Sequence, residues 1–283
     1  MRGASLLRRR AGIALHWAVL GAGFAFLYLP ILLLMAYSFN ASKLATVWAG
    51  FSTRWYGALL RDRQILRAAW ISLKVALCTA TASLVLGTLA ALALTRLRHF
   101  PGKRLFAALV TAPLVMPEVM IGLSILLLLV SIGGVIGVAP KGVIAIWVAH
   151  VTFTLSFVTV VVSSRLQALD HALEEAAMDL GANRPTVFCL ITVPIIAPAL
   201  VAGWLLAFTL SLDDVVVANF LAGPDTTTLP MIVFSSVRMG LTPKINALAT
   251  LMVLLVSLIA CVGGWWMARS EKRCRRDMQL PLR

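Results

Sequence analysis

Three carboxylates stand within or at the end of long apolar runs in this 283-residue chain. Glu118 lies about 13 residues into the run 105–133, close to its middle, and Asp213 and Asp214 follow the run 187–212. An Asp at the centre of a bilayer costs roughly 2.5–3.5 kcal/mol on the insertion scale, so a carboxylate there should face a polar path or a partner. These carboxylates are candidates for binding a cation on its way through a membrane.

Each of these carboxylates also has a structural interpretation. Glu118 is flanked by Pro113 and Pro117, which predict a kinked or broken helix, and it could be protonated or paired with a neighbouring protein. Asp213 and Asp214 could instead cap the following segment or bind Arg238 or Lys244. Adjacent residues on a helix point in different directions, so only one of these two is expected to face a path.

Two tryptophans in the apolar runs, Trp147 and Trp204, could stack on a cation, although packing or interfacial anchoring is the more common role of tryptophans in membranes. His150 is expected to hydrogen-bond to a neighbouring helix rather than to bind a ligand. Lys74 can extend to the membrane surface, and we expect it to face away from a path for cations.

The elements that must position these residues follow from the composition. The chain is 60% hydrophobic and 13% charged, with a mean hydropathy of +0.94, whereas soluble domains carry about 25% charged residues. A crossing helix needs about 20 residues. We therefore predict an all-α integral membrane protein, a single transmembrane domain over residues 1–283 with six transmembrane helices, near 13–37, 68–95, 105–133, 143–163, 187–212 and 247–268.

The distribution of Lys and Arg predicts the orientation. With the amino terminus inside, the inner segments hold 16 of these residues and the outer segments hold 8, while Lys74 lies within a span. Basic residues accumulate on cytoplasmic loops, so both termini are expected in the cytoplasm. The net charge of +14 has the same origin, and nucleic-acid binding is not expected.

Two outer connections are long. The stretch 38–67 contains Trp48, Trp55 and Tyr56, which suit an interfacial or partly folded segment. The stretch 213–246 contains the semi-apolar run 229–237, which predicts a short helix on the outer face.

The inner loop 164–189 is the most informative part of the sequence. An apolar stripe at helical spacing predicts a short amphipathic helix in it, formed by Leu169, Leu173, Ala176, Ala177 and Leu180. Its polar face is acidic, whereas helices that lie on a membrane favour Lys and Arg there. We therefore expect this helix to dock into a groove on a soluble partner.

A turn and a second helix should follow. Gly181 permits a sharp turn, Asn183 can cap the second helix, and Pro185 suits its first turn. Pro194 and Pro198 weaken the next span just after this loop, which could convert a push on the loop into bending. A static kink is the alternative.

The segment EEAAMDLGANRPTVFCLITVPIIAP resembles the signature loop of the permease subunits of ATP-binding-cassette importers. The family pattern of Glu-Ala-Ala, a later Gly, then an apolar residue and Pro is matched by Glu175, Ala176, Ala177, Gly181, Ile191 and Pro194. Further segments, among them TAPLVMPEVMIGLSILLLL and FTLSLDDVVVANFLAGPDTTTLPMIVFSSVRMG, are similar to the polyamine branch of these permeases. The similarity covers nearly the whole chain.

This resemblance implies a permease subunit for putrescine or another polyamine in the bacterial inner membrane, working by alternating access. The loop would be the coupling helix, with Glu175 paired to a basic group of the ATPase and Gly181 shaping the turn. The implied partners are a second homologous permease, two ATPase subunits and a periplasmic polyamine-binding protein. No cofactor is expected on this chain, because ATP and Mg would be held by the ATPase. The residues expected to serve ATPase coupling are Glu174, Glu175, Ala176, Ala177, Asp179 and Gly181.

Missing motifs agree with this expectation. The sequence holds no G-x-x-x-x-G-K-[ST] phosphate loop, no H-E-x-x-H and no nucleophile-plus-base motif, so the chain is not expected to be an enzyme. A secondary carrier with Glu118 as its proton site would need an internal repeat, and none is evident. A membrane scaffold would have no reason to keep Glu118. An importer permease for a different substrate remains an alternative.

Overall fold

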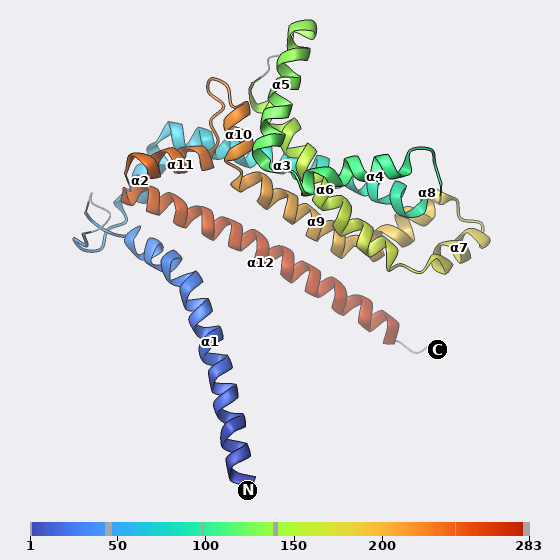
Figure 1. Ribbon diagram of the computed structural model, residues 1–283, viewed down its shortest axis with the longest axis horizontal. Helices are drawn as coiled ribbons and strands as arrows, with labels where there is room; N and C mark the ends of the chain where they lie inside the picture. The colour runs from blue at the N-terminus through green and yellow to red at the C-terminus, as the bar shows by residue number, and fades with distance from the viewer. Residues whose placement is uncertain (1, 43–46, 98, 138–140, 241, 280–283) are drawn as a thin grey trace. The chain divides into compact units, whose positions relative to one another are not determined.

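The computed structural model describes residues 2–42, 47–97, 99–137, 141–240 and 242–279 (Figure 1). Across these residues the secondary structure is helical apart from one isolated β-bridge between Asn40 and Phe51. The elements are α1 (Arg2–Tyr37), α2 (Arg54–Arg61), α3 (Arg63–Arg96), α4 (Lys103–Thr111), η1 (Ala112–Leu114), α5 (Glu118–Ile136), α6 (Val143–Gln167), α7 (His171–Asp179), α8 (Arg184–Val187), η2 (Phe188–Thr192), α9 (Val193–Asp213), α10 (Val216–Leu221), α11 (Leu229–Met239) and α12 (Pro243–Gln279).

Among the described residues, five helices are long and apolar enough to cross a membrane, and a bent pair of helices makes a sixth if it counts as one span. The five lie in α1, α3, α6, the α8–α9 segment and α12. The all-helical membrane architecture predicted from the sequence is therefore confirmed. The short helix predicted at 229–237 is also present, as α11.

The third apolar run is broken. The segment 103–114, which holds α4 and the 3₁₀ turn η1, meets α5 at an angle of 115°. Pro113 and Pro117 lack the N–H that an uninterrupted helix would use, and Pro117 is extended with ψ at 138°. The break predicted from these prolines is confirmed. As a consequence, Glu118 begins α5 and does not lie within a continuous helix.

The chain divides into two compact units, residues 1–62 with 236–254 and residues 63–235 with 255–283. In the first unit, α1 exposes apolar side chains such as Trp17 and Phe26 along its described length, as expected for a span that faces lipid. The stretch after it folds around the buried Asn40. The Asn40 amide donates to the Val47 carbonyl at 2.7 Å, its Oδ1 accepts from Ala49 N at 3.0 Å, and Trp55 Nε1 donates to the Asn40 carbonyl at 2.8 Å.

In the second unit, α3, α6 and α9 pack side by side around a core of small and branched side chains (Figure 1). Helices α3 and α6 approach each other closely at Gly87, where an added Cβ would lie 2.8 Å from Val158 Cγ1. Ser83 and Thr154 share a buried hydrogen bond of 2.7 Å between α3 and α6. Small residues and hydroxyl bridges are typical of helix packing in membranes, because lipid supplies no hydrophobic force that would drive helices together.

The contacts fix the direction of these three helices. Near the start of α3, Ser72 Oγ accepts from Leu229 N at 2.8 Å, and at the start of α6 Gly142 N donates to Leu221 O at 2.8 Å. At the other end of α3, Arg96 reaches α7, which follows α6. Helices α3 and α6 are therefore parallel, and α9 returns antiparallel to them. The connection 97–142 consequently leads from one end of this bundle to the other.

Candidate functional site

The connection between α6 and α9 contains the short helix predicted from the sequence. Helix α7 begins after Asp170, whose Oδ1 accepts from Ala172 N at 3.0 Å and so caps the helix. Of the predicted apolar stripe, Leu169 is buried and Ala177 is half-buried. Leu173, Ala176 and Leu180 are exposed, Leu180 by 90%. Most of the apolar stripe of α7 is thus left uncovered by the described part of the chain.

Gly181 ends α7 in the left-handed conformation, with φ at +91°. Its N–H donates to Met178 O at 2.9 Å, and Ala182 N donates to Ala177 O at 3.1 Å. These two bonds form a Schellman motif, in which a Gly in this conformation satisfies the last carbonyls of a helix. The sharp turn predicted at Gly181 is present.

The second helix is capped as the sequence indicates, because Asn183 Oδ1 accepts from Thr186 N at 3.0 Å and Pro185 lies in the first turn of α8. A π-helical turn, η2, then leads into α9 immediately before Pro194. The wider turn accommodates the missing N–H of the proline. This is the irregular point in an otherwise continuous path from the loop into the span.

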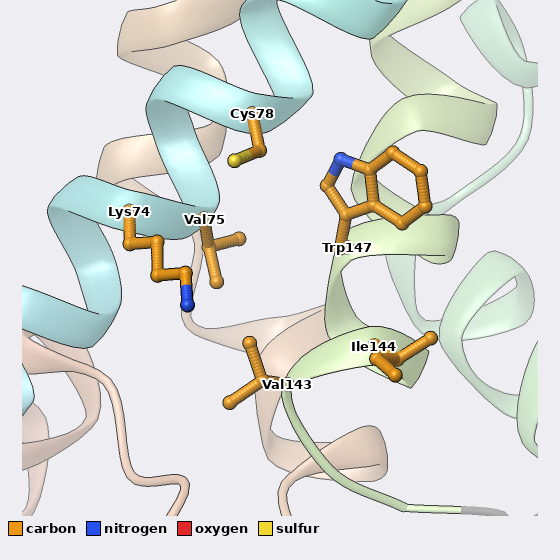
Figure 2. Close-up of a pocket in the computed structure, with 6 residues that line it drawn as sticks. All are labelled: Lys74, Val75, Cys78, Val143, Ile144 and Trp147. Carbon is orange, nitrogen blue, oxygen red and sulfur yellow. The ribbon is translucent and has the colours of Figure 1, made fainter.

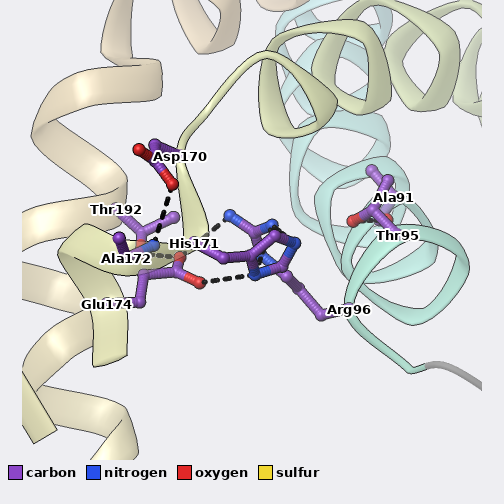
Figure 3. Close-up of polar contacts among 8 residues, drawn as sticks. All are labelled: Ala91, Thr95, Arg96, Asp170, His171, Ala172, Glu174 and Thr192. Carbon is purple, nitrogen blue, oxygen red and sulfur yellow. Dashed lines mark hydrogen bonds and ion pairs between the residues drawn. The ribbon is translucent and has the colours of Figure 1, made fainter. Parts of the chain in front are cut away.

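The neighbouring acidic residues Glu174 and Glu175 have different surroundings. Glu174 Oε1 accepts from Arg96 Nη2 at 3.0 Å and from Thr192 Oγ1 at 2.7 Å, and its side chain is 15% exposed (Figure 3). The side chains of Glu175 and Asp179 are exposed, and neither side chain forms a hydrogen bond or ion pair with the described residues. The sequence did not distinguish these roles, and it gave no sign of the contact between Arg96 and Glu174.

The three carboxylates near the other end of the bundle, Glu118, Asp213 and Asp214, also differ in burial. Glu118, at the start of α5, and Asp213, at the end of α9, are both exposed. Asp214 is buried: its Oδ2 lies 3.1 Å from His150 Nε2 and accepts from Ala218 N at 2.8 Å, which caps α10. The structural interpretation of Asp214 as a cap is thus observed. His150 is hydrogen-bonded to a neighbouring helix, as predicted, because its Nδ1 lies 2.8 Å from Ser211 Oγ.

Of the two basic residues that were candidates to pair with Asp213 or Asp214, Lys244 has another partner. Lys244 forms an ion pair with Asp62. Asp225 lies in a Gly-Pro-Asp turn with φ at +60° and pairs with Arg67 at 3.2 Å on the surface.

The two tryptophans differ in their neighbours. Trp204 stacks on Phe208 with the ring centroids 5.4 Å apart, beside the core of the second unit. Trp147 lines a mainly apolar cavity of about 300 Å³ that Lys74 also lines; Figure 2 shows Lys74 and Cys78 on α3 opposite Trp147 and Val143 on α6. A cationic side chain in this cavity opposes the entry of a second cation.

Sequence reasoning missed the polar pairs between distant segments. The Arg96–Glu174 pair joins residues 78 apart in the chain, and the His150–Asp214 pair joins residues 64 apart. The only local signal is the residue type, since a polar group in or beside an apolar run requires a partner.

Comparison with known proteins identifies the class. The family model of the binding-protein-dependent transport system inner membrane component matches residues 83–276. The chain belongs to this family. It is accordingly a multi-pass protein of the inner membrane and a translocation subunit, in a family whose ATPase is carried by partner subunits.

Individual relatives share most of the sequence. The chain is 57% identical over 262 residues to the putrescine transport system permease protein PotI of Escherichia coli K12, covering 92% of this chain and 93% of that protein. It is 38% identical to the spermidine/putrescine transport system permease protein PotC of the same strain, covering 93% of this chain and 97% of that protein.

Solved structures share the fold at lower identity. A chain of a bacterial ABC transporter that imports the acidic polysaccharide alginate matches with a TM-score of 0.74 at 16% identity, over 95% of this chain and 99% of that one. A chain of the MetNI methionine ABC transporter in an inward-facing conformation matches with a TM-score of 0.61 at 18% identity, over 73% of this chain and 95% of that one.

Proposed function

We propose that this chain is one of two homologous permease subunits that together form the translocation path of an ATP-driven importer for putrescine or a related polyamine. The observation that carries the proposal is the 57% identity to a putrescine permease over nearly the whole chain. The 38% identity to a spermidine/putrescine permease supports the same substrate class. The path would open alternately to the two sides of the inner membrane, driven by two ATPase subunits inside and supplied by a polyamine-binding protein outside.

In this proposal the single transmembrane domain crosses the bilayer six times, with both termini in the cytoplasm. The parallel direction of α3 and α6 supports this, because the chain between them must pass from one end of the bundle to the other. The bent segment α4–η1–α5 then provides one crossing. The excess of Lys and Arg in the inner segments supports the orientation.

The loop around α7 would bind the ATPase subunit. Its support is the exposed apolar side chains Leu173 and Leu180 beside the exposed carboxylates of Glu175 and Asp179. A short helix with an apolar stripe and an acidic rim fits a groove that offers apolar contacts and a basic group. Ala176 and Ala177 would allow close approach, and the ATPase would hold ATP and Mg.

The substrate path would use Glu118 and Asp213. Both carboxylates are exposed, Glu118 at the start of α5 and Asp213 at the end of α9, and two carboxylates suit a substrate with an ammonium group at each end. Asp214 would shape this region by capping α10. Trp204 remains a candidate for contact with the cation, and Trp147 is the weaker candidate because Lys74 lines the same cavity.

Uptake of radiolabelled putrescine into proteoliposomes tests the function. The vesicles hold this chain with its co-encoded permease and ATPase subunits, ATP inside, and the binding protein outside. We expect putrescine uptake that requires both ATP and the binding protein. We also expect spermidine, added as a competitor, to reduce this uptake. ATP hydrolysis without putrescine uptake would overturn the substrate, and uptake independent of ATP would favour a secondary carrier.

The variant Glu175→Arg tests the ATPase contact in the same vesicles. Reversing a charge at a docked carboxylate should reduce uptake and ATPase co-purification by about tenfold or more, since like charges at an interface cost several kcal/mol. The matched control is Asp225→Arg, an exposed carboxylate in a turn at the other end of the bundle. Equal loss in both variants would show that the α7 loop is not the ATPase contact.

A further inference from the structure

Glu174 is the centre of a polar cluster that joins three segments of the second unit. Its Oε1 accepts both from Arg96, the last residue of α3, and from Thr192, the last residue of the π-helical turn before α9. We call Arg96, Glu174 and Thr192 the linkage cluster (Figure 3). Through it, the short helix α7 is tied to the ends of two membrane-crossing helices.

The side chains of the linkage cluster are largely buried, and this makes their contacts costly to break. The Arg96 and Glu174 side chains are 16% and 15% exposed, and Thr192 is buried. His171 adds a contact, because its Nε2 lies 2.8 Å from Arg96 Nη1. A carboxylate that is largely removed from water and paired with a guanidinium is costly to separate, since removing one partner leaves an uncompensated charge. Exposed ion pairs lack this property because water screens them.

The position of the cluster suggests a purpose beyond stability. We propose that Glu174 is a positioning residue that makes α7 move as one body with the end of α3 and the start of α9, so that displacement of α7 reaches the membrane helices. The proposal rests on the proposed function, in which the ATPase displaces this loop. Glu175, next in the chain but exposed, would contact the ATPase, while Glu174 would pass the movement on.

The π-helical turn gives the linkage a defined point of action. Thr192 lies at the junction between η2 and α9, directly before the segment that holds Pro194. A regular helix there would transmit force along its own hydrogen bonds, but a π turn followed by proline is a point where helices deform. The bond from Thr192 to Glu174 joins α7 directly to the last residue of this turn, so a displacement of α7 need not pass along the turn itself to reach the start of α9.

The first test measures putrescine uptake and ATP hydrolysis in the same proteoliposomes. We expect Glu174→Gln to retain ATPase co-purification and hydrolysis while putrescine transported per ATP falls by about two- to thirtyfold, the range seen when connecting residues are changed. Thr192→Val should act in the same direction, and Thr192→Ser, which keeps the hydroxyl, should restore coupling. Glu175→Gln is the control that should weaken the ATPase contact itself.

The second test reads the linkage without any substrate. Spin labels are placed at the exposed positions Leu97 and Ala172 in assemblies whose native cysteines have been replaced, and their separation is measured with and without a non-hydrolysable ATP analogue. We expect one narrow distance distribution in both states for the parent assembly. Glu174→Gln should broaden it or make it depend on nucleotide.

The outcomes separate this proposal from the proposed function. Hydrolysis and uptake that fall in parallel in Glu174→Gln, or a distance between the labels that changes with nucleotide in the parent assembly, would overturn the linkage. If the parent assembly hydrolyses ATP without taking up putrescine, the substrate is wrong, and the spin labels still decide whether the cluster joins the segments.

Discussion

His150 in α6 and Asp214, the residue after α9, form a buried pair in which Nε2 and Oδ2 are 3.1 Å apart. The same carboxylate accepts from the backbone of Val217 and Ala218 at the start of α10. One side chain therefore fixes the relation of three helices beside the exposed Asp213. The buried acid that shapes this region and the exposed acid that we propose to contact a substrate are neighbours in the sequence.

This arrangement predicts that the stability of the assembly is far more sensitive to replacement of Asp214 than of Asp213. Asp214→Ala removes the α10 cap and leaves the buried Nε2 of His150 without a partner, so the assembly should lose about 2–5 kcal/mol of stability. Asp213→Ala, at the exposed neighbour, should lose less than about 0.5 kcal/mol. Thermal unfolding of the purified assemblies in detergent measures both. Equal melting temperatures for the two variants would contradict the buried pair.

Replacing Glu118 or Asp213, the two carboxylates proposed for the substrate path, should reduce transport without affecting assembly of the subunits. Glu118→Gln or Asp213→Asn should reduce putrescine uptake by about tenfold, equivalent to the loss of about 1.4 kcal/mol of cation stabilisation. ATPase co-purification should stay unchanged. Asp225→Asn, whose carboxylate pairs with Arg67 on the surface, is the matched control and should retain uptake. Normal uptake in both path variants would exclude these carboxylates as substrate contacts.

Gly181 should be difficult to replace. Its φ of +91° lies in the left-handed region of backbone conformation. A residue with a Cβ pays roughly 1–2 kcal/mol to adopt that conformation. Gly181→Ala should therefore open the Schellman bonds, and the amides of Gly181 and Ala182 should exchange their hydrogens about fivefold to thirtyfold faster. Gly57→Ala, in the helical part of α2 with open space around it, should leave exchange in this loop unchanged. Unchanged protection in Gly181→Ala would contradict the motif.

Gly87 should be equally sensitive for a different reason. A Cβ there would lie 2.8 Å from Val158 Cγ1 and 3.2 Å from the Leu155 carbonyl oxygen, so Gly87→Ala should destabilise the assembly by about 1–3 kcal/mol. Gly264→Ala, which meets no atom within 4 Å, is the control. Adding Val158→Ala should recover part of the loss by making room. A melting temperature unaffected by Gly87→Ala would show that α3 and α6 pack less closely.

Much of the architecture could be predicted because its signals are local. Apolar runs long enough to cross a bilayer identified the helices, and Pro113 and Pro117 identified the break before Glu118. Asn183 and Gly181 identified the helix cap and the turn of the loop. Each signal operates within a few residues, where chain geometry and the water-to-lipid transfer of side chains dominate.

The roles of individual acidic residues could not be predicted in this way. Glu174 and Glu175 are the same residue type at adjacent positions, as are Asp213 and Asp214. Their difference arises from partners 64 to 78 residues away, Arg96 for Glu174 and His150 for Asp214. The spacing of residue types along a helix does not show which side chain from a distant part of the chain will contact a given position.

The sequence by itself determined that this chain forms helices that cross a membrane and a capped amphipathic helix between them, because hydrophobic length and backbone preference are properties of short segments. The tertiary structure decided which carboxylates are buried and which stay exposed, and it brought Arg96 and Thr192 to the same oxygen of Glu174. Those outcomes depend on packing α3, α6 and α9 side by side, since only that packing removes one acid from water and leaves its neighbour in it.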